Sequence, residues 1–167
     1  FYATNPGGDA TNTLTVTLGS NVITGAATRT FTLDGNVILA TAHTDFGAAM
    51  LNSFTGAKTF DVASTVSYNL GGAQTIASSA NVTGGLIYGN ISMAGTGNKT
   101  PGASLDINGS ISATNGVFVD AGFNHTVAGD WLLATANYIP TGTITLDGTN
   151  QNVSLNTVGA TTFNNLV

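Results

Sequence analysis

Short runs in which apolar and polar residues alternate are the strongest constraint on the fold of this chain. Residues 13–18 read Thr-Leu-Thr-Val-Thr-Leu, and residues 143–146 read Thr-Ile-Thr-Leu. The same alternation recurs at 66–68, 91–93, 105–107 and 117–119. A period of two residues is typical of a β-strand with one buried and one exposed face. Each run is only about 3–6 residues long, which is short for a strand, so we predict an all-β chain built from many brief strands.

Glycine, asparagine and aspartate separate these runs. Such residues stand together at 34–36, 69–72, 108–109, 115–116 and 147–148. They accept left-handed backbone conformations and form tight turns. Asn-Gly and Asp-Gly turns also connect antiparallel hairpins, so the turns alone leave hairpins open as an alternative to parallel coils. A helical turn is predicted only at residues 48–51, Ala-Ala-Met-Leu.

A long internal repeat favours parallel coils over hairpins. In the same order, residues 65–69, 74–76 and 88–91 match residues 143–147, 151–153 and 163–166. The offset is about 75–78 residues, which at roughly 20–25 residues per coil corresponds to three or four coils. We therefore predict a single β-solenoid segment with repeat units 1–64 (degenerate), 65–142 and 143–167 (truncated).

The predicted fold is a right-handed parallel β-helix, because parallel crossovers are almost always right-handed. With rungs about 4.8 Å apart, about seven coils would form a rod roughly 35 Å long. Inward positions should stack like on like along the rod, and Asn or Thr should form ladders at the turns. A pair of β-sandwich domains with hairpin connections is the alternative fold.

Composition excludes several classes of protein. Lys and Arg number 3 against 8 Asp and Glu, and three cations cannot form the basic patch that nucleic acid requires. Cysteine is absent, which excludes a disulfide framework, a Cys-based zinc site and a thiol nucleophile. No run approaches the roughly 18 apolar residues of a membrane helix. The chain begins with Phe1 rather than Met, which predicts a piece of a longer or processed protein.

Few side chains could take part in catalysis or metal binding, and we predict no enzyme, no catalytic residue and no cofactor. The acidic residues are Asp9, Asp34, Asp45, Asp61, Asp106, Asp120, Asp130 and Asp147. Two of them could form the carboxylate pair of a glycosidase, but most lie near Gly or Asn, as turn residues do. Their oxygens leave Ca²⁺ as a candidate ion, although neither an EF-hand loop nor a calcium-binding nonapeptide repeat is present.

The remaining candidate residues also have structural interpretations. His43 and His125 lack a second His or a Cys at ligand spacing and are interpreted as solvent-facing or turn residues. Trp131 is assigned to the core, because Trp is highly buried on average. The Gly84-Gly85 pair lacks the pattern of a phosphate-binding loop. The triplets Thr13/Thr15/Thr17, Thr28/Thr30/Thr32 and Thr141/Thr143/Thr145 raise an ice-binding alternative, against the ordinary preference of Thr for exposed strands.

The second half of the chain resembles one repeat of very large, secreted bacterial surface adhesins. The residues that carry the resemblance are 88–91, 99–100, 105–111, 120–122, 127–131, 143–148, 151 and 162–166. Those adhesins are rich in Gly, Thr and Asn, are similar to filamentous haemagglutinins, and are in many cases exported by the type IX pathway. The resemblance covers about residues 60–167 and is weaker over 1–59. Asp130 stands where Asn is commoner, and Leu132-Leu133 replace polar residues.

The resemblance implies a parallel β-helix on a cell surface and no enzyme. We therefore predict a non-catalytic structural module of an extracellular adhesin or fibre, which assembles end to end with copies of itself or with adjacent repeats. Surface glycans are a further candidate partner, and a glycan- or ice-binding β-helix is the alternative function.

Overall fold

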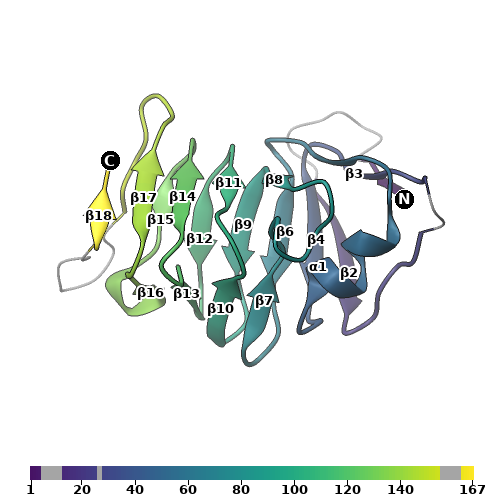
Figure 1. Cartoon of the computed structure of the whole chain (residues 1–167), viewed down its shortest axis with the longest axis horizontal. Helices are drawn as coiled ribbons and strands as arrows, with labels where there is room; N and C mark the ends of the chain where they lie inside the picture. The colour runs from purple at the N-terminus through teal and green to yellow at the C-terminus, as the bar shows by residue number, and fades with distance from the viewer. Residues whose placement is uncertain (5–12, 26–27, 155–162) are drawn as a thin grey trace.

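The computed structural model describes residues 1–4, 13–25, 28–154 and 163–167 and shows a parallel β-solenoid of about six turns (Figure 1). Every strand pairing in these residues is parallel. The parallel β-helix prediction is therefore confirmed, and the hairpin-connected sandwich is wrong. There are fewer turns than the seven expected because early coils are long: Thr65 pairs with Asn90, 25 positions later, whereas Asn90 and Ser110 are 20 apart.

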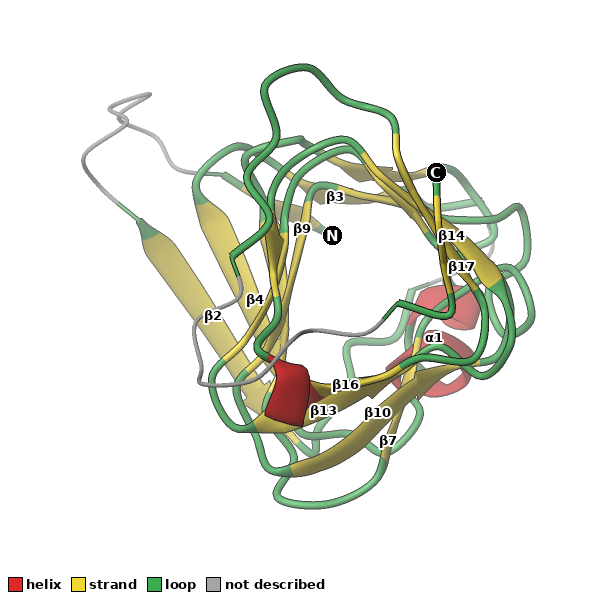
Figure 2. Ribbon diagram, turned by 90° about the vertical axis from the view of Figure 1, so that its left-hand side faces the viewer, coloured by secondary structure: helices red, strands yellow, loops and turns green. Residues whose placement is uncertain are grey.

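One sheet runs the length of the rod and contains one strand from each of six coils. Its strands are β2 (Leu14–Gly19), β4 (Val37–Thr41), β6 (Thr65–Tyr68), β9 (Asn90–Met93), β12 (Ile111–Ala113) and β15 (Trp131–Leu132). Figure 2 looks along the rod and shows these strands superposed on one side of the coil.

The other sides of the coil carry three shorter sheets. The four-stranded sheet contains β7 (Gln74–Ile76), β10 (Gly97–Pro101), β13 (Gly116–Val119) and β16 (Tyr138–Ile139). The five-stranded sheet contains β8 (Ile87–Tyr88), β11 (Asp106–Ile107), β14 (Asn124–Val127), β17 (Thr143–Leu146) and β18 (Asn165–Leu166). The three-stranded sheet contains β1 (Tyr2–Ala3), β3 (Phe31–Leu33) and β5 (Lys58–Phe60).

Helical turns interrupt two coils. The predicted turn is present as α1 (Phe46–Ala49) followed by the 3-10 turn η1 (Leu51–Ser53), which occupy the place of a strand next to β7, toward the N-terminal end of the rod (Figure 1). Asp45 caps α1 by accepting a hydrogen bond from the Ala48 N–H, a common role for Asp at this position. A second 3-10 turn, η2 (Thr135–Asn137), was not predicted.

Inward residues of the six-stranded sheet stack in register, as predicted. Leu39 pairs with Val66, Val66 with Ile91, Ile91 with Ile111 and Ile111 with Trp131. The last three of these side chains have no exposed surface. Because each residue covers its neighbours above and below, the row excludes water from the backbone ladders.

A ladder of side chains follows one corner, where the chain enters the six-stranded sheet. The Asn90 Oδ1 accepts from the Ser110 N–H at 2.8 Å, the Ser110 Oγ from the Asp130 N–H at 2.9 Å, and the Asp130 Oδ1 from the Asn152 N–H at 2.8 Å. The predicted turn ladder is thus present at this corner, with Ser and Asp in place of Thr. It ties each coil to the next where the backbone bends away from regular pairing.

The matched segments of the long repeat lie in different sheets. Residues 65–68 form β6 of the six-stranded sheet, and residues 143–146 form β17 of the five-stranded sheet. The glutamine that follows each strand nevertheless has the same role. Gln74 Nε2 donates to the carbonyls of Thr41 and His43, and Gln151 Nε2 donates to those of Val127 and Gly129. The repeat therefore contains a strand-turn-Gln motif used at two corners, and the unit boundaries stay predictions.

Candidate functional site

The wall of the solenoid is interrupted between β5 and β8. The three-stranded sheet ends at β5 and the five-stranded sheet begins at β8, and no ladder joins them in the described residues. The two strands are nevertheless neighbours, because the Phe60 and Tyr88 rings pack edge to face with centroids 5.8 Å apart. We call the opening between these strands the seam groove.

Side chains and close backbone contacts hold the coils together at both ends of the seam groove. At one end Gly89 lies so near β5 that a Cβ there would be 2.1 Å from the Asp61 carbonyl oxygen. At the other end the Asn52 side-chain amide makes the pair of hydrogen bonds that the backbone of a neighbouring strand would make. Its Nδ2 donates to the Asn81 carbonyl at 2.8 Å, and its Oδ1 accepts from the Thr83 N–H at 2.8 Å. The groove is therefore a bounded gap in the wall rather than an open end.

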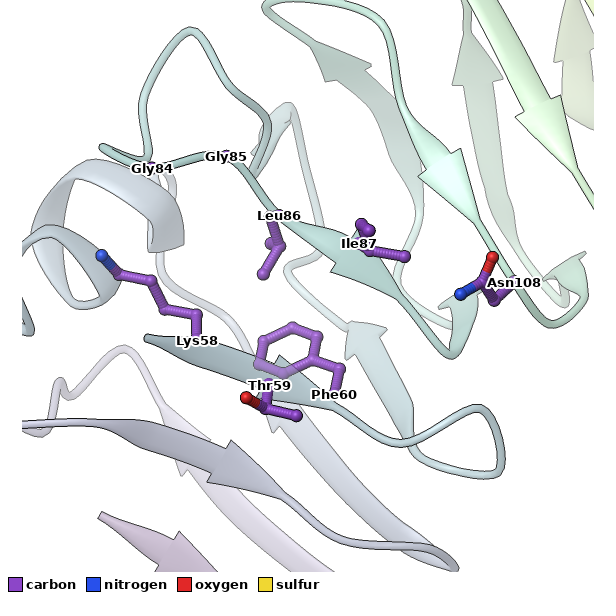
Figure 3. Close-up of a pocket in the computed structure, with 8 residues that line it drawn as sticks. All are labelled: Lys58, Thr59, Phe60, Gly84, Gly85, Leu86, Ile87 and Asn108. Carbon is purple, nitrogen blue, oxygen red and sulfur yellow. The ribbon is translucent and has the colours of Figure 1, made fainter. Parts of the chain in front are cut away.

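The seam groove has a volume of about 310 Å³. It is lined by Lys58, Thr59 and Phe60 from β5, by Gly84, Gly85, Leu86 and Ile87 from the opposite coil, and by Asn108 (Figure 3). In Figure 3 the Leu86 side chain and the Phe60 ring point toward one another across the groove. Ile87 is 50% exposed, so the lining combines apolar surface with hydroxyl, amide and amine groups.

Backbone groups of both strands also face the seam. The Phe31 N–H donates to the Ala57 carbonyl, and the Asp61 N–H donates to the Leu33 carbonyl. Since alternate residues of a strand direct their backbone groups to opposite sides, the N–H and C=O groups of Lys58 and Phe60 point toward β8. These backbone donors and acceptors lack a strand partner in the described part of the chain.

A second polar cluster is buried in the later coils, around Asp120. Its carboxylate accepts hydrogen bonds from the Tyr138 hydroxyl at 2.8 Å, from the Thr141 hydroxyl and N–H, and from the Gly122 N–H. Burial alone would raise the pKa of Asp120, but these hydrogen bonds outweigh it and lower the pKa to about 2. Burial and the neighbouring carboxylate raise the pKa of Tyr138. Both groups hold their ordinary charge states at neutral pH, and the cluster is structural.

His125 belongs to the same region, and its predicted exposure is wrong. The side chain is 1% exposed and lies on the inward side of β14. Its Nδ1 accepts the Leu105 N–H at 3.0 Å, so Nε2 carries the proton and donates to the Asp120 carbonyl at 3.2 Å. Burial lowers the pKa of His125, so the ring is a neutral connector between coils.

Lys99 and the pair Tyr68 and Tyr88 are also buried, and their polar atoms form hydrogen bonds inside the rod. Lys99 has no exposed surface, and its Nζ donates to the carbonyls of Leu70, Gly72 and Thr96 at 2.7, 2.8 and 2.9 Å. These three bonds use every donor of the ammonium, although burial lowers the pKa of Lys99.

The hydroxyls of Tyr68 and Tyr88 lie 2.6 Å apart and form a closed ring with the backbone of Ala77. Burial raises the pKa of both tyrosines.

Most other candidate residues lie where turn chemistry predicts. The carboxylates of Asp34, Asp45 and Asp61 accept nearby backbone N–H groups, and Asp9 lies outside the described residues. Within the described ranges, no group of three or more His, Cys, Asp or Glu side chains could hold a metal ion.

The assignment of Trp131 to the core is confirmed, because its side chain has no exposed surface. The threonine triplets do not stack into an array. Thr15 pairs with Ile38, and Thr17 pairs with Ala40.

Neither the seam groove nor the burial of Lys99 was predicted from the sequence. Lys58 and Lys99 look alike in sequence, because each is followed by Thr. Only the register distinguishes them: Lys99 pairs with the buried residues Gln74 and Phe118, whereas Lys58 lies at the end of a sheet.

Comparison of the chain with protein-family models, with curated proteins and with solved structures gives no match. Among the described residues, no helix has the length and apolar character needed to cross a bilayer.

Proposed function

We propose that this chain is a non-catalytic structural module of an extracellular or cell-surface adhesin or fibre. The observation that carries the proposal is the six-stranded parallel ladder, which continues through every coil and is doubled by the ladder of Asn90, Ser110 and Asp130 at its corner. The buried polar side chains described above connect one coil to another. A rod built in this way transmits load along many backbone hydrogen bonds at once.

The surface composition supports the same role. Charged residues make up 7% of the chain, and outward positions of the six-stranded sheet include short, partly exposed polar side chains such as Ser92 and Ser112. Like charges stacked at rung spacing would repel, so an uncharged outer face suits a long stack of coils. The resemblance to secreted surface adhesins adds the proposed location outside the cell.

End-to-end assembly with a second copy is part of this proposal. Parallel strands have a direction, so translation along the rod would set β18 of one copy against β1 of the next with matching polarity. Apolar side chains are exposed near both ends, including Leu14 at 38% and Leu166 at 46%. Such a head-to-tail contact does not close on itself and would produce filaments.

Sedimentation and electron microscopy over a range of protein concentrations test the assembly. We expect concentration-dependent filaments that are lost in Leu14→Lys and Leu166→Lys variants, since lysine on an edge strand opposes pairing. Val62→Lys is the matched control, because Val62 is 57% exposed on a side turn. Discrete monomers at every concentration would overturn the assembly, and immunogold labelling confined to the interior of native cells would overturn the proposed location.

A further inference from the structure

We propose that the seam groove binds a single uncharged sugar unit of a glycan. This inference concerns a ligand and goes beyond the structural role proposed above, so either can fail without the other. It depends on three features of the groove: its apolar floor, its free polar side chains and its unpaired backbone edges.

The apolar floor matches one face of a pyranose ring. Leu86 and the Phe60 ring point toward one another across the groove, and Ile87 lies beside them in the lining (Figure 3). A sugar ring presents C–H groups on its faces and hydroxyls around its rim, so it can cover such a floor without burying its polar groups.

The polar side chains at the rim are available to a ligand. In the described structure the Thr59 hydroxyl and the Asn108 amide are both exposed and form no hydrogen bond within the chain. The Lys58 Nζ donates to the Thr83 carbonyl at 2.9 Å, which leaves two of its three donors free. The Thr59 hydroxyl and the Asn108 amide can each donate a hydrogen bond to a sugar hydroxyl or accept one from it, whereas the Lys58 ammonium can only donate.

The backbone edges favour a polyhydroxyl ligand over a peptide strand. Lys58 and Phe60 on β5 face Ile87 on β8, and each presents backbone groups without a strand partner in the described part of the chain. An added strand would have to lie between β5 and β8, but the Phe60 and Tyr88 rings already pack against each other there, with their centroids 5.8 Å apart. A sugar lying over the opening can donate and accept hydrogen bonds without separating the strands.

The volume of the groove and the charge of its lining restrict the class of ligand further. A volume of about 310 Å³ lies at the lower limit of small-molecule sites, which suits one sugar unit rather than an oligosaccharide. Lys58 is the only cation among the described residues that line the groove, so an anionic sugar would gain a single ionic contact at the surface, which contributes little to affinity.

Titration followed by amide NMR spectra tests the proposal on the intact chain. The probes are the methyl glycosides of glucose, galactose, mannose and N-acetylglucosamine, with cyclohexanol as an apolar ring of similar size. We expect at least one glycoside to shift the amide signals of Lys58, Phe60 and Ile87 to saturation with a Kd of about 1 mM, the scale for a ligand of this size in a shallow site. Cyclohexanol should leave these signals unshifted.

Two side-chain variants and one control separate binding from folding. Thr59→Val and Asn108→Ala each remove one hydrogen-bonding group at an exposed position and should weaken binding about 3- to 10-fold. Thr145→Val, on β17 outside the groove, should bind as the unaltered chain does, and each spectrum reports whether the variant is folded. The proposal is overturned if no glycoside reaches saturation, if cyclohexanol produces the same shifts, or if both groove variants bind with unchanged affinity.

Discussion

Asn90 connects three coils, and its removal provides a quantitative test of the corner ladder. Its Nδ2 donates to the carbonyls of Val62 and Ser64 at 3.0 and 2.9 Å, and its Oδ1 accepts the Ser110 N–H at 2.8 Å. A hydrogen bond contributes about 1 kcal/mol net. Asn90→Ala should therefore lower the free energy of unfolding by about 3 kcal/mol, or the melting temperature by about 6–12 °C for a chain of this size.

Asn115→Ala is the matched control. Asn115 also connects one coil to another, but it is exposed and makes one such bond, from its Nδ2 to the Ala94 carbonyl at 3.0 Å. Its loss should cost about 1 kcal/mol or less. Urea unfolding monitored by circular dichroism gives both values, with the m-value checking that the unfolding transition is unchanged. Equal losses for the two variants would refute the claim that the corner ladder stabilises the stack.

Asn90→Asp is a more specific test, because it keeps the shape of the side chain and replaces only its amide NH2 group with an oxygen. The new carboxylate would still accept the Ser110 N–H but would place negative charge against the Val62 and Ser64 carbonyls. The pKa of this carboxyl should rise, because its neutral form can donate to a carbonyl. Stability should therefore be lowest above that raised pKa and recover as the pH falls through it, and pH-independent stability would contradict the contacts assigned to Asn90.

Three further predictions concern packing and charge. Gly89→Ala should cost about 3 kcal/mol, because its Cβ would meet the Asp61 carbonyl at 2.1 Å, whereas Gly72→Ala, with nothing within 4 Å, should remain within about 0.5 kcal/mol in urea unfolding. Ile111→Ala, in the buried row, should cost about 3 kcal/mol, and a loss below about 1 kcal/mol would mean that the row is not buried. Because the pKa of His125 is lowered from 6.5, its stabilising contribution is complete above pH 6.5 and is lost as the pH falls below it. The contribution of Asp120 is lost between pH 3.8 and about 2, so urea midpoints should fall in two acid steps, and the first should be absent in His125→Phe.

Much of the fold can be predicted from local pattern, because strand formation depends on a period of two. The inward residues Val66 and Ile91 follow from that alternation, since they begin the runs 66–68 and 91–93. The same rule could have placed His125 inside, since it shares parity with the buried Val127 on β14. His125 was interpreted as a solvent-facing or turn residue because no second His or Cys stands at ligand spacing, although a buried His is stable when both ring nitrogens have partners.

The rest depends on register between coils, which no local pattern contains. Lys99 is buried only because its neighbours in the stack are Gln74 and Phe118, and because three carbonyls from two turns converge on its ammonium. The seam groove lies where the three-stranded sheet ends at β5 and the five-stranded sheet begins at β8. A pairing that fails to form leaves no residue signature, so the groove could be found only in three dimensions.

Distances along the outer row of the six-stranded sheet test the stacking of coils most directly. The chain has no cysteine, so pairs of introduced cysteines can carry spin labels without background. From Thr17, the ladder passes through Ala40 to Ser67, Ser92, Ser112 and Leu132, one rung at a time. The distances from Thr17 to the last four should increase in order, at about 10, 14, 19 and 24 Å. Distances that do not increase by one rung at each step would contradict the solenoid, and the proposed structural role would fail with it.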